Sequence, residues 1–139
     1  MTRILIITSC TGHKSVSHEQ QLTQEDFRLG PEHVRQREVG LAEVLTPAEE
    51  LYTGQQHVRL MRGVQALRTS GKETDIDLWI LSAGYGLVPG DRRLVPYDCT
   101  FDGMRKRELR EWADFLGVPD APISSQKTIL RVTQNSQMW

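Results

Sequence analysis

Reactive side chains gather in two loops, each directly after one of the most hydrophobic runs of the chain. The first loop, residues 9–14, reads Ser-Cys-Thr-Gly-His-Lys and follows the apolar run 3–8. It offers a thiol, two hydroxyls, an imidazole and an ammonium, a set that can cradle an anion or a nucleotide-like ligand. The Gly-Lys-Ser/Thr ending of a Walker loop is absent. A polar turn without a ligand is the alternative interpretation.

The second loop, residues 82–97, follows the apolar run 78–81 and is rich in glycine and proline. A rigid strand fixes such a loop, and its glycines let a ligand approach the backbone. Several of its side chains are able to react with or recognise a ligand: Ser82, Tyr85, Asp91, Arg92, Arg93 and Tyr97. The tyrosines can stack on a base or donate a hydrogen bond, and they can equally be packing residues.

Three side chains are candidates for catalysis. Cys10 would be a nucleophile or a peroxide-reactive thiol if His13 or Lys14 lowered its pKa, but a buried cysteine is also a common core residue. Asp91 and Asp98 are the acids available for hydrolysis or transfer at a nucleoside, and both suit turns equally well.

No metal or cofactor is predicted, because the four histidines show no ligand spacing with each other or with the cysteines. Charge also limits the function. With 17 Lys and Arg against 18 Asp and Glu, the net charge of −1 argues against a large nucleic-acid-binding surface. A local basic patch remains open, either from the arginines within 55–69 or from the basic residues within 92–110. In the second stretch acids interleave with the bases, so a solvated helical face is the alternative.

Composition predicts one soluble domain. The 139 residues are 38% hydrophobic and 25% charged, which suits a globular protein with a real core. The first apolar run is too short for a signal peptide, and no later run could span a membrane, so we expect a cytoplasmic protein. The two cysteines, Cys10 and Cys99, lie in different loops and are predicted to be free thiols.

The elements that must position these loops begin with strands at 3–8 and 78–82. A polar segment at 15–33 is expected to be an insertion loop or a mobile lid, followed by a helix from Pro31. A helix starting at 46–49 would use Thr46 as its cap and Glu49 to complete a capping box.

An amphipathic helix is predicted at 55–69. A last helix would be capped by Thr100 or Asp102 and end at Gly117. We therefore predict an α/β single domain over residues 1–119, with a small, mainly parallel sheet flanked by helices. Residues 120–139 form a polar tail of uncertain structure, in which a short strand at 128–132 is expected.

Three motifs, in order along the chain, resemble those of the YaaA-like family. Leu-Ser-Ala-Gly-Tyr-Gly-Leu-Val at 81–88 is followed by Pro96 and Tyr97. The opening strand with Ser9-Cys10 and Lys14, and the stretch from Pro47 to Gly54, are similar to the other two motifs. The resemblance covers roughly residues 3–117. The chain is shorter than the full-length family members, so the resemblance also predicts a truncated C-terminus and an incomplete sheet.

The resemblance implies a cytosolic α/β protein linked to protection from hydrogen peroxide, with proposed DNA binding. It places the ligand-binding site at residues drawn from both loops and from the segment before the amphipathic helix: Ser9, Cys10, Lys14, Tyr52, Ser82, Gly84, Tyr85, Gly86, Pro96 and Tyr97. We expect the two loops to converge on one pocket for a nucleotide, a base or a nucleic-acid end. Lys14 would pair with phosphate there, and Tyr85 or Tyr97 would stack.

Two other functions stay open. The first is an enzyme acting on a nucleoside or nucleic-acid base, such as a glycosidic-bond hydrolase or transferase, with Asp91 or Asp98 as its carboxylate. The second is a thiol protein that reacts with peroxide through Cys10. The oligomeric state is not predicted.

Overall fold

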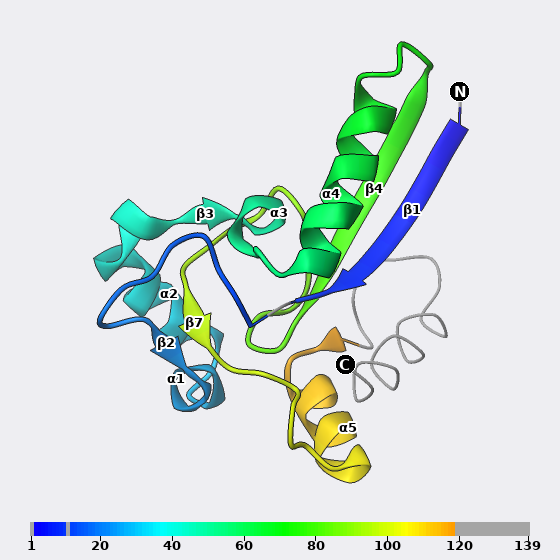
Figure 1. Cartoon of the computed structure of the whole chain (residues 1–139). Coiled ribbons are helices and arrows are strands. Elements are labelled where there is room, and N and C mark those ends of the chain that lie inside the picture. The colour runs from blue at the N-terminus through cyan, green and yellow to red at the C-terminus, as the bar shows by residue number, and fades with distance from the viewer. Residues whose placement is uncertain (1, 11, 119–139) are drawn as a thin grey trace.

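A three-stranded sheet forms the centre of the protein. The computed structural model describes residues 2–10 and 12–118 (Figure 1). Strand β1 (Thr2–Ser9) pairs in parallel with β4 (Thr74–Ser82), and β5 (Gly86–Pro89) pairs antiparallel with the other side of β4. The predicted α/β single domain is confirmed, with a mixed sheet whose longest ladder is parallel.

Both predicted strands are present and longer than expected. β4 starts at Thr74, because Thr74, Ile76 and Leu78 alternate with exposed Asp75 and Asp77. This period of two is typical of a strand with one exposed face. β5 follows directly after a tight turn, in which Gly86 adopts a left-handed φ of 80°. The start of the second loop is thus a hairpin that doubles back along β4.

Helix α4 (Gln55–Arg68) leads the chain back so that β4 can run parallel to β1. It corresponds to the helix predicted at 55–69 and buries His57 and Val64. Figure 1 shows α4 lying along the sheet, with its first turn near the end of β1. The amino end of α4 and the carboxyl ends of β1 and β4 therefore share one edge of the fold, where α/β proteins place their ligands.

A helical insertion separates β1 from α4. It contains six short elements: β2 (Leu22–Thr23), α1 (Gln24–Arg28), α2 (Pro31–Gly40), a 3-10 turn (Ala42–Val44), β3 (Thr46–Pro47) and α3 (Ala48–Leu51). The helix predicted from Pro31 is confirmed. The loop predicted for 15–33 is wrong over its second half, which holds β2, α1 and the start of α2. The carboxylate of Asp26 accepts a 2.9 Å hydrogen bond from the Thr23 N–H and so starts α1.

Two small ladders join the insertion to the second loop. β2 pairs in parallel with β7 (Tyr97–Asp98), and β3 pairs antiparallel with β6 (Arg93–Leu94). Much of the segment predicted as a glycine-rich loop is therefore short strands. These pairings hold the second loop at fixed positions against the insertion.

Two of the predicted helix caps are wrong. The Thr46 hydroxyl donates to the Val44 carbonyl, and Thr46 lies in β3, because its backbone pairs with Leu94. The last helix, α5 (Lys106–Phe115), starts after Arg105, so Thr100 and Asp102 lie too far upstream to cap it. The predicted end at Gly117 is confirmed by its left-handed φ of 75°.

The core lies between the sheet, the insertion and α5. Its most deeply buried large side chains include Leu22, Leu51, Tyr52, Ile80, Leu81, Leu94, Tyr97 and Leu109. No helix within the described part of the chain is long and apolar enough to cross a membrane. The polar tail at 120–139, with the strand expected at 128–132, lies outside the described residues.

Candidate functional site

The ends of β1 and β4 bring the two predicted loops into contact. Ser9 lies opposite Leu81 in the parallel ladder, and the Cys10 N–H donates to the Leu81 carbonyl at 2.9 Å. The next residues along the two strands, Cys10 and Ser82, therefore lie side by side where the strands end. Residues more than 70 positions apart meet here because the pairing is parallel and in register.

A chain of buried hydroxyl groups extends from Ser82. The Tyr97 hydroxyl oxygen lies 2.7 Å from the Ser82 Oγ and 2.6 Å from the Tyr52 hydroxyl oxygen. The Ser82 Oγ also accepts hydrogen bonds from the N–H groups of Gly84 and Tyr85. Two accepted bonds use both lone pairs of Ser82, so its proton points to Tyr97. The Tyr97 proton is then available to Tyr52 or to the thiol of Cys10.

Lys14 packs over this hydroxyl chain. Its Nζ lies 4.4 Å from the centre of the Tyr97 ring and 5.8 Å from that of Tyr52, and its backbone forms a β-bridge with Tyr52. Burial lowers the pKa of Lys14, while the nearby Cys10, Asp98 and Cys99 oppose the shift. Between residues 2 and 118, Thr11 aside, no ion pair includes Lys14. The structure thus holds a half-buried ammonium group on an aromatic face.

Both cysteines are free thiols, as predicted. Burial raises the pKa of Cys10, although hydrogen bonds with the Ala83 backbone and Tyr97 and the charge of Lys14 oppose the shift. Burial likewise raises the pKa of Cys99 to about 11, and its Sγ donates to the Ala83 carbonyl at 3.3 Å. Neither thiol is activated, because both favour the protonated form at neutral pH.

Burial also raises the pKa values of Tyr52, Tyr85 and Tyr97. All three hydroxyls therefore stay protonated over the physiological range. In this state they can donate hydrogen bonds, but they cannot act as bases.

Four of the predicted site residues contact other parts of the chain. The Tyr85 hydroxyl accepts a bond from the Val95 N–H, and its ring packs edge-on against Phe27. Phe27 also covers Gly84. The Pro96 carbonyl accepts from Leu22, and Gly86 packs against Leu116. These contacts hold the second loop in place, so we assign a positioning role to Gly84, Tyr85, Gly86 and Pro96.

The two candidate acids lie in different places. Asp91 is exposed in the turn after β5, next to Gly90, whose N–H donates to the Leu78 carbonyl. Leu78 lies four positions before Ser82 on β4, so Asp91 is remote from the strand ends. Asp98 is also exposed, but it follows Tyr97 directly and its charge opposes the lowering of the Lys14 pKa. Of the two, only Asp98 adjoins the site.

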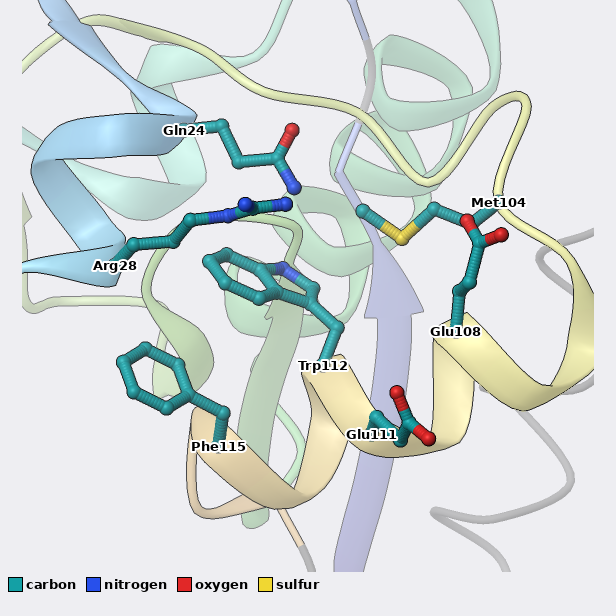
Figure 2. Close-up of a pocket in the computed structure, with 7 residues that line it drawn as sticks. All are labelled: Gln24, Arg28, Met104, Glu108, Glu111, Trp112 and Phe115. Atoms are coloured by element: carbon teal, nitrogen blue, oxygen red, sulfur yellow. The ribbon is translucent and has the colours of Figure 1, made fainter.

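A groove beside the site was missed from the sequence. It lies between α1 and α5 and has a cavity volume of about 350 Å³ (Figure 2). Its lining comes from both helices and the turn before α5: Gln24, Arg28, Met104, Glu108, Glu111, Trp112 and Phe115. The Trp112 indole N–H donates to the Ala83 carbonyl at 2.6 Å, which ties the groove to the loop after β4. The signal in the sequence was Phe115, a large apolar side chain that lies off the helical stripe formed by Leu109, Trp112 and Leu116.

No group of three or more His, Cys, Asp or Glu among the described residues is arranged to hold a metal ion. The histidines serve other contacts. His33 lies 2.8 Å from the Asp26 carboxylate, and His57 bonds the Glu49 carbonyl at 2.7 Å.

One family model matches the chain. It is described as a family of unknown function (DUF6884), and it matches residues 42–118, more than half of the sequence. The match includes Tyr52, Ser82, Tyr97 and all of α4, whereas Cys10 and Lys14 precede it. Neither the curated proteins nor the solved structures contain a match.

Proposed function

Because the chain belongs to this family of unknown function, we propose its function from the site itself: it binds the phosphate of a nucleotide or nucleic acid where β1 and β4 end. The observation that carries the proposal is Lys14, a half-buried ammonium group packed on Tyr97. Keeping a cation partly out of water is costly unless an anion joins it. A phosphate group would supply that anion.

The start of α4 supports the same ligand. The N-cap residue of α4 is Gly54, which has no side chain of its own to cap the helix. Its first-turn N–H groups, from Gln55 to His57, carry the positive end of the helix dipole. The Thr53 N–H donates to the His13 carbonyl at 2.9 Å, so the loop that carries Lys14 is fastened beside this helix end. A lysine next to the amino end of a helix is a favourable arrangement for phosphate.

The buried hydroxyl chain suits binding better than catalysis. Tyr97 holds Lys14 on its ring face and is itself fixed by Ser82 and Tyr52. Covalent chemistry would need an activated nucleophile or a placed base, and burial works against the Cys10 thiolate. An enzyme acting on a nucleoside would rest on exposed Asp98 alone. We therefore propose a binding protein that acts in the cytoplasm, and a role in peroxide protection remains a prediction from the resemblance.

Isothermal titration of the full chain would test the proposal. The ligands are inorganic phosphate, nucleoside monophosphates and triphosphates, the matching nucleosides, and short single- and double-stranded DNA. We expect the phosphorylated ligands to bind and Lys14→Gln to weaken them at least about tenfold, because a charge-assisted hydrogen bond is lost. Lys72→Gln is the matched control, since Lys72 is exposed in the turn between α4 and β4. Equal affinities for wild type and Lys14→Gln would exclude the proposed site.

A further inference from the structure

The groove between α1 and α5 has the size and walls of a site for a flat ring. Its volume of about 350 Å³ is within the range of small-ligand pockets. Trp112 and Phe115 stack in its wall with ring centres 5.3 Å apart, and Phe115 is 53% exposed. The Arg28 guanidinium lies 5.9 Å from the centre of the Trp112 ring. A planar group already packs on this wall, and the exposed part of Phe115 leaves apolar surface for a second planar group to contact.

Polar side chains with unused hydrogen-bonding capacity also line the groove. Figure 2 shows the Gln24 amide on the α1 side and the Glu108 carboxylate on the α5 side, beside Met104. Within the described residues, neither side chain forms a hydrogen bond or an ion pair, whereas Glu111 is engaged by Arg107 at 3.1 Å. An amide both donates and accepts, and a carboxylate accepts two bonds. Together they match a ring edge that carries N–H donors.

A second lobe extends the groove toward Lys14. It has a volume of about 420 Å³, shares Gln24, Arg28, Met104 and Glu108 with the first, and reaches Asp98 and Cys99. Asp98 directly follows Tyr97, and the Lys14 ammonium packs on the Tyr97 ring. The groove and the proposed phosphate site are therefore neighbours, separated by the Asp98–Cys99 segment.

The charges around the groove favour a single nucleotide over a polymer. Among the described residues, four carboxylates line the two lobes, from Asp98, Asp102, Glu108 and Glu111, against the one guanidinium of Arg28. A nucleic-acid backbone laid along this surface would meet like charge at each phosphate. A neutral base with N–H donors meets acceptors instead.

We propose that the groove binds the base of a mononucleotide, and that it prefers bases with an exocyclic amino group. The base lies in the groove against the wall formed by Trp112 and Phe115, and its N–H groups donate to Glu108 and to the Gln24 carbonyl oxygen. This inference rests on the function proposed above, because it adds a base site to the phosphate site at Lys14. It differs from that proposal in the residues that it requires.

The test compares inorganic phosphate with four nucleoside monophosphates, those of adenine, cytosine, guanine and uracil, by isothermal titration. We expect the three amino-bearing nucleotides to bind more tightly than phosphate or the uracil nucleotide. Phe115→Ala and Glu108→Gln should each weaken them about tenfold and leave phosphate binding unchanged. Both residues are exposed on α5, so the variants should fold, and Glu50→Gln on α3 is the matched control.

The outcomes separate the two proposals. If phosphate binds through Lys14 but the groove variants bind every nucleotide as wild type does, the base site is excluded and the phosphate site stands. If free nucleosides bind through Phe115 and Glu108 while Lys14→Gln has no effect, the base site stands and the phosphate site is excluded. The last ligand to be tested is a short arginine peptide. Tight, Glu108-dependent binding of this peptide with no nucleotide binding would mean that the groove takes cations and would overturn the inference.

Discussion

The hydroxyl oxygens of Tyr52 and Tyr97 lie 2.6 Å apart in the interior, although 45 positions separate the two residues. Tyr52 enters from the segment before α4, and Tyr97 from the end of the second loop. Their contact, continued to Ser82, joins the insertion, the sheet and the loop in one buried polar network. A network of this kind fixes a unique arrangement only while all its members are satisfied.

Removing the central hydroxyl should therefore destabilise the protein. Tyr97→Phe leaves the Ser82 and Tyr52 hydroxyls without their shared partner, at a cost of about 1–3 kcal/mol in unfolding free energy. Urea denaturation followed by far-ultraviolet circular dichroism measures the loss. In a double-mutant cycle, Tyr52→Phe should cost less when Tyr97 is already Phe, because the bond between them is gone. Strict additivity of the two substitutions would contradict the network.

Gly84 is predicted to be intolerant of even one added carbon. A Cβ at this position would overlap the Phe27 ring, which is itself buried between Tyr85 and Tyr97. Gly84→Ala should thus lower the unfolding free energy by about 1–3 kcal/mol through overpacking. Its melting temperature is the readout, and Phe27→Leu in the same chain should recover part of the loss.

Gly63 provides the matched control for this substitution. It lies in the middle of α4, where an added Cβ would meet nothing within 4 Å. Gly63→Ala should stabilise the protein by about 0.5–1 kcal/mol, because alanine favours the helix. If both alanine variants melted at the wild-type temperature or above, the close packing of Phe27 on Gly84 would be refuted.

Sequence patterns located the loops of the site because parallel strands determine where their ends meet. The apolar runs before Ser9 and Ser82 are long enough to identify, and their pairing brings Cys10 beside Ser82 without further information. The elements around Phe27 and Thr46 were missed because they are too short to give such a pattern. They are two to five residues long and gain their stability from tertiary pairing, as when Leu22 joins Tyr97. The groove depends on how α1 and α5 approach each other, which no local pattern encodes.

Protonation of Asp26 at low pH should lower the unfolding free energy of the protein. Burial would raise the pKa of this carboxyl, but hydrogen bonds from His33 and Thr23 and the charge of Arg37 outweigh it and lower the pKa. A folded-state pKa below the unfolded value means that the contribution is complete above about pH 4 and is lost as the pH falls through the folded pKa.

The measurement is the unfolding free energy between pH 6 and pH 2.5, compared for wild type and Asp26→Asn. The difference between the two should shrink as the pH drops below about 4. Glu32→Gln is the control, since Glu32 is exposed and pairs with Arg35 on the surface. A difference for Asp26→Asn that stays constant down to the lowest pH would show that its charge is not involved.

The two thiols should react slowly in the folded protein. Burial raises the pKa of Cys10 and brings that of Cys99 to about 11, so little thiolate exists at neutral pH. Alkylation by iodoacetamide, followed for each cysteine by mass spectrometry, should be slow at pH 7 and accelerate as the pH rises. Lys14→Ala should slow Cys10 further, because the ammonium group favours its thiolate, whereas Lys72→Ala should change nothing. Rapid, selective modification of Cys10 at pH 7 would contradict this prediction, because it requires a thiolate that burial disfavours. It would then support the alternative in which Cys10 reacts with peroxide.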